Sequence, residues 1–312
     1  MNKSCFKAVL CCLLMLLSGV SGGYTQSLIN PNRFFFISDT QVPMFVETLI
    51  LDAYRNEEAR DSLFADVIRQ NPRTMFMTGD LISTGSSEKA WAPTDRFLNT
   101  LNKINAKTYA IPGNHEYMVK SSWGIQKFKN RFPVNWLFGY TVTVDSIAVI
   151  MLNSNFNELS IKELGQQLSW YKSALDSLDA NPAILAIFVC THHSPYSNSK
   201  VEGCSQPVID LIVPAFEKSK KSKLFISGHS HNLEYFSEGL DKHFLVIGGG
   251  GGIAQPLIPM NDRIHHDLLQ QESKPVYFYL IVERNKNFIK LTARGFKKDF
   301  NYFYFDIGTI TL

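Results

Sequence analysis

Five short polar segments of the sequence carry the side chains that could bind metal ions. Each follows a run of apolar residues, and together they contain aspartate, glutamine, asparagine and histidine. They are Asp39-Thr40-Gln41, Gly79-Asp80, Gly113-Asn114-His115-Glu116, His192-His193 and Gly228-His229-Ser230-His231. Oxygen and nitrogen donors without thiolates suit Mn, Fe or Zn. Because these donors exceed what one ion uses alongside water, we expect two ions with a shared carboxylate and a bridging hydroxide.

The charge and spacing of these residues indicate a site for phosphate. Two divalent ions outweigh two aspartates and one hydroxide by one positive charge, so the site would attract an anion such as phosphate. Asp39 and Gln41 are two positions apart, as are His229 and His231, and alternate residues of an extended chain point the same way. Glycine begins the segments GD, GNHE and GHSH, where it would let the backbone turn sharply.

The apolar runs that must position these residues alternate with helical patterns. Strand-like runs cover residues 34–37, 74–78, 108–111, 184–190 and 224–227. Helical patterns cover residues 46–70, 88–105, 123–131, 161–178 and 207–218. This alternation predicts an α/β fold with a largely parallel sheet, whose strands end at one crevice where ligands bind. A second sheet is predicted from a hairpin at 140–144 and 148–152 and from strands at 244–247, 276–282, 288–293 and 302–307.

The N-terminal residues differ in composition from the rest of the chain. Lys3 and Lys7 precede an apolar run at residues 8–17, and small residues follow that run. This order is typical of a secretory signal peptide, and the run is too short to span a bilayer. We therefore expect residues 1–22 to be a signal peptide and residues 23–312 to form a single domain. The mature protein would be secreted or periplasmic, without a membrane span.

The overall charge gives no sign of a nucleic-acid partner. The chain has 31 basic and 28 acidic residues, and it contains no clustered basic motif. Two cysteines lie beyond the leader, Cys190 and Cys204. They could form a disulfide across a short loop, or Cys190 could be a buried thiol, because it ends an apolar run. The sequence leaves both alternatives open, as it does the oligomeric state.

Taken in order, the five polar segments resemble the motifs of the calcineurin-like metallophosphoesterase superfamily. The combination of GD, GNHE and GHSH is the most specific part of this resemblance, and any one of them alone would be weak. The resemblance implies two mixed sheets packed face to face with helices outside, a four-layer α/β/β/α sandwich. It implies a catalytic histidine, His115, that assists the leaving group. It also implies one metal site of Asp39, Gln41, Asp80 and His231, and another of Asp80, Asn114, His192 and His229.

The resemblance further implies a dinuclear phosphoesterase that acts on a small phosphate ester. We expect phosphomonoesters to be favoured, because a positive site stabilises their dianion, with phosphodiesters as the alternative. Gln41 stands where Asp-x-His is the commonest motif, which implies looser metal binding at that position and motivates a catalytically silent alternative that binds metal or phosphate. Ser83 stands where purple acid phosphatases have a metal-binding tyrosine, so the chain resembles that secreted branch without its tyrosinate.

Two further features of the sequence, the pair of histidines at 192 and 193 and the run of glycines at 248–252, have more than one interpretation. We expect His192 rather than His193 to bind metal, because alternate residues at a strand end face the same side. The five glycines at 248–252 predict a tight turn near the wall of the site. They do not match a nucleotide-type phosphate loop, because the Lys and Ser or Thr of such a loop do not follow, and contact of their backbone amides with the substrate is the alternative to a simple turn.

Overall fold

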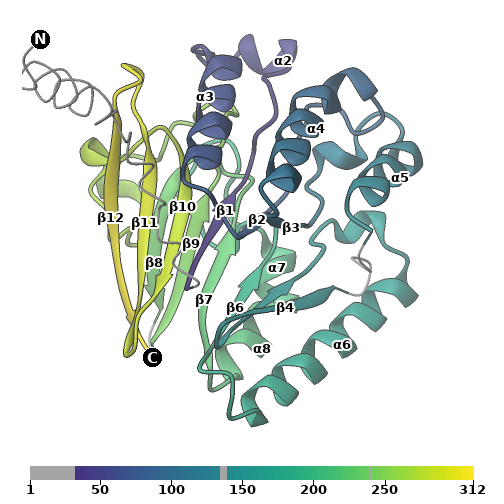
Figure 1. Cartoon of the computed structure of the whole chain (residues 1–312), viewed down its shortest axis with the longest axis vertical. Helices are drawn as coiled ribbons and strands as arrows, with labels where there is room; N and C mark the ends of the chain where they lie inside the picture. The colour runs from purple at the N-terminus through teal and green to yellow at the C-terminus, as the bar shows by residue number, and fades with distance from the viewer. Residues whose placement is uncertain (1–31, 134–138, 239–240) are drawn as a thin grey trace, which may run out of the picture. The chain divides into compact units, whose positions relative to one another are not determined.

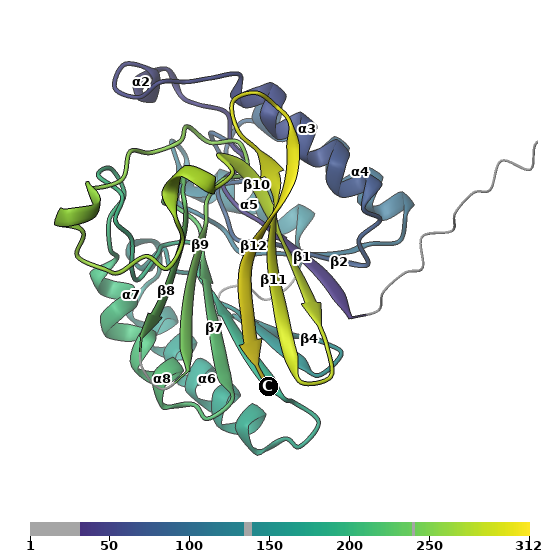
Figure 2. The same ribbon diagram turned by 90° about the vertical axis from the view of Figure 1, so that its left-hand side faces the viewer.

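The computed structural model describes residues 32–133, 139–238 and 241–312. Those residues form two mixed sheets of six strands each, with helices beside them (Figures 1 and 2). The predicted signal peptide at residues 1–22 lies outside the described part of the chain. Within that part, no helix combines the length and the apolar character that crossing a membrane requires.

The first sheet joins the N-terminal strands to the last three strands. Its order is β12 (Tyr302–Thr311), β11 (Phe288–Phe296), β10 (Tyr277–Arg284), β1 (Arg33–Ile37), β2 (Thr74–Met77) and β3 (Lys107–Ala110). β1, β2 and β3 run parallel, so their carboxyl ends lie at one edge, whereas β10 is antiparallel to β1. β1 lies inside the sheet and its apolar residues 34–37 are buried, as expected for a strand covered on both faces.

The second sheet contains the middle of the chain. Its order is β4 (Tyr140–Val144), β5 (Ile147–Met151), β6 (Ala186–Cys190), β7 (Ser222–Ser227), β9 (Lys242–Ile247) and β8 (Leu233–Glu238). β5, β6, β7 and β9 run parallel, and the predicted hairpin of β4 and β5 is confirmed. The sequence analysis does not predict β8, because the buried polar residue Glu234 interrupts its apolar pattern.

Three apolar cores hold the sheets and helices together as four layers. Between the sheets, Phe34 of β1 packs on Phe188 of β6, with ring centroids 6.2 Å apart. The outer face of the first sheet packs on α3 (Asn56–Arg69), α4 (Glu88–Lys103) and α5 (Ser121–Arg131). The outer face of the second sheet packs on α6 (Ile161–Ala180), α7 (Gln206–Leu211) and α8 (Val213–Lys218). The predicted four-layer α/β/β/α sandwich is therefore confirmed.

Two of the predicted helices are each divided in the structure. The longest one forms α2 (Phe45–Thr48) and α3, separated where Arg55 adopts a left-handed backbone with φ of 49°. The side-chain amide of Asn56 donates to the carbonyls of Gly251 and Gly252 at 2.8 and 2.9 Å, which fixes the start of α3. The last predicted helix forms α7 and α8, each of which has a proline in its first turn.

The two cysteines in the described residues are both free thiols. Cys190 is buried at the end of β6, whereas Cys204 is exposed. The interpretation of Cys190 as a buried thiol is therefore confirmed, and no disulfide joins the pair in this structure.

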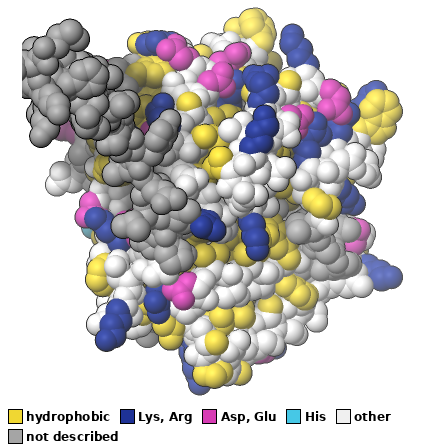
Figure 3. Space-filling view, viewed as in Figure 1, with side chains coloured by type: hydrophobic (Ala, Val, Ile, Leu, Met, Phe, Trp, Pro, Cys, Tyr) yellow, Lys and Arg dark blue, Asp and Glu magenta, His cyan; other side chains and the backbone are white. Residues whose placement is uncertain are grey.

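Charged side chains of both signs share the face of the molecule seen in Figure 3. Lys and Arg side chains are interspersed there with acidic and hydrophobic ones. This mixture agrees with the near balance of 31 basic and 28 acidic residues in the sequence.

Replacing Phe36 by alanine should strongly destabilise the fold. Phe36 is fully buried between the sheets and stacks on Phe76, with ring centroids 4.8 Å apart. Removing a buried phenylalanine leaves a cavity, and we expect the free energy of unfolding to fall by about 4 kcal/mol. Urea unfolding followed by circular dichroism measures this loss. Phe45→Ala is the control, because Phe45 is 77% exposed and should change the free energy by less than about 0.5 kcal/mol.

Candidate metal centre

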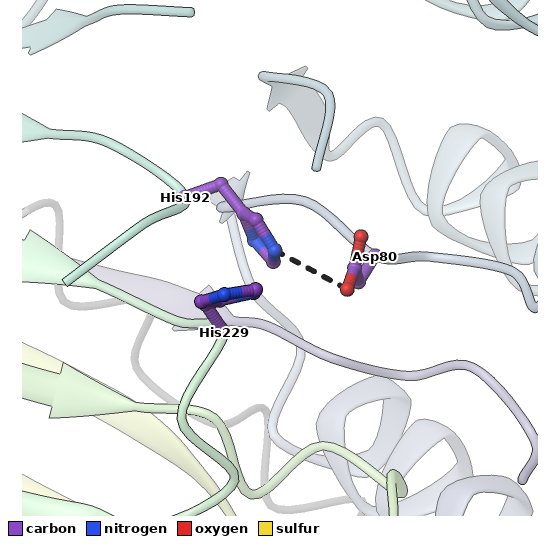
Figure 4. Close-up of side chains that lie close together, drawn as sticks. All are labelled: Asp80, His192 and His229. Atoms are coloured by element: carbon purple, nitrogen blue, oxygen red, sulfur yellow. Dashed lines mark ion pairs between the residues drawn. The ribbon is translucent and has the colours of Figure 1, made fainter. Parts of the chain in front are cut away.

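The polar segments that follow five strands come together at one place. β1, β2 and β3 supply them from the first sheet, and β6 and β7 supply them from the second. The site therefore lies at the carboxyl ends of strands from both sheets, rather than of one parallel sheet as the sequence analysis expects. Figure 4 shows Asp80, His192 and His229 converging, and one potential ligand atom from each lies within 4.8 Å of the others.

The other predicted metal ligands surround this group. The contacts are His192 Nε2 to Asp80 Oδ2 at 3.2 Å and to Asn114 Oδ1 at 3.1 Å, and His231 Nε2 to Asp39 Oδ1 at 3.5 Å and to Gln41 Nε2 at 3.1 Å. Gln41 Nε2 also lies 3.5 Å from Asp80 Oδ2, so Asp80 stands between the two halves of the cluster. The structure thus brings all seven predicted ligands close together.

The backbone bends sharply at three of these residues. Asp39, Asp80 and His229 have φ of 58°, 53° and 67°, in the left-handed region that non-glycine residues seldom adopt. Such strain persists only where surrounding contacts enforce it, and it is common at functional sites. The predicted extended geometry of Asp39 with Gln41 is therefore wrong, although both side chains do reach His231.

The neighbouring glycines provide space more than they provide turns. Only Gly79 of the three has a positive φ, 99°. A Cβ atom on Gly113 would lie 2.1 Å from Oδ1 of Asp80, and one on Gly228 would lie 2.3 Å from Oδ2 of Asp39. Glycine at these two positions therefore leaves room for the carboxylates, which corrects the predicted role of the glycines as turn formers.

Three histidines at the site are held in the same tautomer. In each of them Nδ1 lies within hydrogen-bond distance of a backbone carbonyl, and because a carbonyl only accepts, Nδ1 carries the proton. The pairs are His115 with Ser83 at 2.9 Å, His192 with Thr78 at 2.9 Å and His231 with Ile253 at 2.7 Å. The Nε2 atoms of His192 and His231 face the carboxylates and can present a lone pair to a cation, and the carbonyls behind Nδ1 orient the rings as they do for metal-binding histidines.

The buried carboxylates and histidines perturb one another strongly. Burial raises the pKa of Asp80, but the charges of His192 and His115 outweigh burial and hold that pKa far below its usual value. Burial lowers the pKa of His192, but the Asp80 carboxylate outweighs it and raises the pKa to about 9. A positive charge is therefore strongly favoured between these side chains, whether a proton or a metal ion supplies it.

Glu116 stabilises the backbone around the site through hydrogen bonds to its carboxylate. This fully buried carboxylate accepts hydrogen bonds from the backbone N–H groups of Asp80, Leu81 and Gly113, at 2.9, 2.8 and 2.6 Å. Burial and then the charge of Asp80 raise the pKa of Glu116 to about 7. The glutamate of the GNHE segment thus fixes the backbone that presents Asp80.

The side-chain oxygen of Gln41 is a potential metal ligand without a hydrogen-bond partner among the described residues. This Oε1 atom is buried, while Nε2 faces His231 and Asp80. Rotating the amide would exchange these two atoms and present Oε1 to the same place. The oxygen and nitrogen donors around Gln41 therefore fit a hard or borderline divalent cation such as Mn, Fe or Zn.

Sequence analysis did not identify Glu202, which contacts the site from the loop after β6. Its Oε2 atom lies 2.9 Å from Nε2 of His229, and this hydrogen bond lowers the pKa of Glu202. The loop is anchored because Oγ of Ser230 donates to the Glu202 carbonyl at 2.8 Å. No motif surrounds Glu202 in the sequence, so only the position of its loop reveals this contact.

His193 does not occupy the position of His192, and it is held differently. Its Nδ1 lies 2.8 Å from Oγ of Ser154. Burial, followed by the charges of His229 and His192, lowers the pKa of His193 well below its ordinary value. His192, by contrast, contacts both Asp80 and Asn114, which agrees with the preference for His192 drawn from the sequence.

The glycines at 248–252 lie against the wall of the site. The N–H groups of Gly250 and Gly252 donate to the carbonyls of Ser38 and Asp39 at 3.0 and 2.9 Å. A Cβ atom on Gly252 would lie 2.5 Å from the ring of His231. These amides are thus already bonded within the chain, and glycine permits the close approach.

A comparison with protein families identifies the chain. The sequence model of the calcineurin-like phosphoesterase family matches residues 32–233, which is more than half of the chain. This protein belongs to the calcineurin-like phosphoesterase family. No protein with curated function matches the sequence significantly.

Solved structures share the fold at low sequence identity. A dimetal phosphatase from Danio rerio has a TM-score of 0.59 and 13% identity, over 88% of this chain and 99% of its own. GAP50 from Plasmodium has a TM-score of 0.61 and 16% identity, over 90% of this chain and 88% of its own. A purple acid phosphatase from yellow lupin, Lupinus luteus, has a TM-score of 0.64 and 14% identity, over 90% of this chain and 53% of its own. These likenesses show that the calcineurin-like phosphoesterase shares their fold.

Metal affinity should fall as the pH is lowered. The pKa of His192 is about 9, so below that pH a proton competes with the ion for Nε2. For each proton that the ion displaces, the apparent metal affinity falls about tenfold when the pH is lowered by one unit. Titration of chelator-stripped protein with Mn by calorimetry at pH 7 and pH 8 measures the difference. Equal affinity at the two pH values would show that no proton leaves His192 when the ion binds.

Glu202→Ala should weaken metal binding by about tenfold, because the carboxylate that orients His229 is lost. Glu202→Gln keeps an acceptor oxygen and should have a smaller effect. Competition with a chromogenic chelator measures the affinity, and Glu217→Gln on the exposed surface of α8 is the control. An affinity unchanged in Glu202→Ala would contradict this orienting role.

Proposed function

We propose that this protein is a two-metal phosphoesterase that hydrolyses phosphate esters, with phosphomonoesters favoured. The observation that carries the proposal is the pair of buried aspartates, Asp39 and Asp80, at 0% and 1% exposure, surrounded by amide and imidazole groups. Such a set fits two divalent cations, and the family to which the chain belongs supports a phosphate ester as the substrate. The leader-like residues 1–22 support a secreted or periplasmic location.

The residues would divide between two ions as their contacts suggest. Asp39, Gln41, Asp80 and His231 would hold one ion, and Asp80, Asn114, His192 and His229 would hold the other. When bound, the pair supplies positive charge for the phosphoryl oxygens and an activated water. The protein supplies the fixed positions, because the strained backbone, the glycines and the carbonyls behind each Nδ1 leave these side chains little freedom.

His115 is placed to act on the leaving group. It is 6% exposed, its Nδ1 is bonded to the Ser83 carbonyl, and its Nε2 lies 3.8 Å from Oδ2 of Asp80. The ring therefore presents Nε2 to the centre in a fixed orientation. With Nδ1 donating to Ser83, we assign to the doubly protonated ring a second proton on Nε2, which the departing oxygen accepts as the ester bond breaks.

His115→Asn should lower kcat by about 10²- to 10³-fold while metal content stays unchanged. Hydrolysis of p-nitrophenyl phosphate and of bis-p-nitrophenyl phosphate with added Mn measures the effect, and the ratio of the two rates gives the monoester preference. His266→Asn is the control, because His266 is exposed on a loop. Undiminished turnover in His115→Asn would remove the assigned role.

The alternative of a catalytically silent member is motivated by Gln41, whose amide is a weaker ligand than imidazole. Metal analysis together with the same assay separates the alternatives. Two ions per chain with turnover support the proposal. Bound metal without turnover on either ester would favour the silent alternative.

A further inference from the structure

A cavity of about 300 Å³ opens beside the candidate metal centre. Asn114 and His193 are among the residues that line it, and Nε2 of His192 lies 3.1 Å from Oδ1 of Asn114. Tyr117 and Phe156 contribute aromatic side chains to its walls. A phosphate ester bound at the metals would therefore extend its alcohol portion into this cavity.

His193, which lines the cavity, carries a hydrogen-bond donor on its ring. Oγ of Ser154 accepts from the backbone N–H groups of His192 and His193, at 3.2 and 3.0 Å. Its own proton is therefore left to donate to Nδ1 of His193, 2.8 Å away. A ring that accepts at Nδ1 carries its own proton on Nε2, on the opposite edge from Ser154. This N–H suits an ester or phosphate oxygen.

The lining of the cavity also includes the carboxylate of Glu158. Glu158, in the short helix η3 (Phe156–Glu158), lines the cavity and is exposed to solvent. Its Oε2 accepts from Oγ of Ser121 at 2.6 Å, which leaves further acceptor positions on the carboxylate. Among the described residues, no Lys or Arg lines this cavity, so none in the lining neutralises the Glu158 carboxylate. Its charge is therefore available to a ligand.

We propose that this cavity selects the leaving group, and that the substrate is a zwitterionic phosphomonoester of a small amino alcohol. This inference rests on the proposed function. The phosphate would lie at the positive metal centre, and the ammonium group would lie at Glu158 between the aromatic faces of Tyr117 and Phe156, which also attract cations. A second anionic group on the alcohol would meet Glu158 without a compensating cation.

The reaction is hydrolysis and requires no further reactant. A water oxygen forms a new bond to phosphorus as the bond from phosphorus to the alcohol oxygen breaks. The amino alcohol leaves with a proton from Nε2 of His115, and inorganic phosphate remains. The proton that the attacking water gives up passes to solvent and restores the proton of His115, so that His115 is unchanged over the cycle. Glu158 and His193 take no part in bond breaking, and they position the alcohol.

Three phosphomonoesters that differ in the charge of the alcohol test this inference. They are phosphoethanolamine, glycerol 2-phosphate and 3-phosphoglycerate, whose alcohols are cationic, neutral and anionic. We expect kcat/KM of the metal-loaded enzyme to decrease in that order, with about a tenfold difference between the first and the last. Glu158→Gln should lower the rate on phosphoethanolamine and reduce this ratio at least about fivefold. Glu217→Gln, a surface change on α8, should leave the ratio unchanged.

Binding to the His115→Asn variant distinguishes failure of this inference from failure of the proposed function. Calorimetry with the metal-loaded variant and the same three esters gives the order of affinity without turnover. If phosphoethanolamine binds best and Glu158→Gln removes its advantage, the cavity is assigned correctly even when no ester is hydrolysed. Equal affinities for the three esters, or a preference that Glu158→Gln leaves intact, would overturn the inference.

Discussion

The burial of two aspartates, with which no lysine or arginine of the described residues pairs, is the constraint on which the site depends. Asp39 and Asp80 are almost completely inaccessible, and an ionised carboxylate in such a place is costly unless positive charge or hydrogen bonds compensate for it. Backbone N–H groups supply part of the compensation, from His229 to Asp39 and from His115 to Asp80. Positive charge, from protons on the surrounding histidines or from metal ions, compensates for the remainder.

The two sheets allow the strained backbone at these aspartates to persist. Left-handed residues at the ends of β1, β2 and β7 each cost free energy, and isolated turns would relax. Here the preceding strands lie inside sheets whose inner faces form a common apolar core. Because that core fixes both sheets, residues separated by about half the length of the chain can be held within hydrogen-bond distance of one another.

Much of the fold and of the candidate site could be predicted from the sequence. The apolar runs identify the strands beneath the site, because those strands are buried on both faces, and the motifs identify the seven clustered residues. The physical reasons for particular residues at the site were less well predicted. Gly113 and Gly228 prevent collisions with carboxylates, which depends on contacts across sheets that no local pattern records. β8 was missed because Glu234 is buried and satisfied by Ser197 and Asn198. The contact of Glu202 depends in the same way on a loop position.

The glycines at 248–252 connect three parts of the chain that are distant in sequence. Gly250 and Gly252 hold the backbone of Ser38 and Asp39, while the carbonyls of Gly251 and Gly252 hold Asn56 at the start of α3. The segment thus ties the start of a surface helix to the end of the strand that carries the first aspartate. A substitution that displaced the beginning of α3 would therefore shift the backbone of Asp39 as well, although the two lie far apart in the chain.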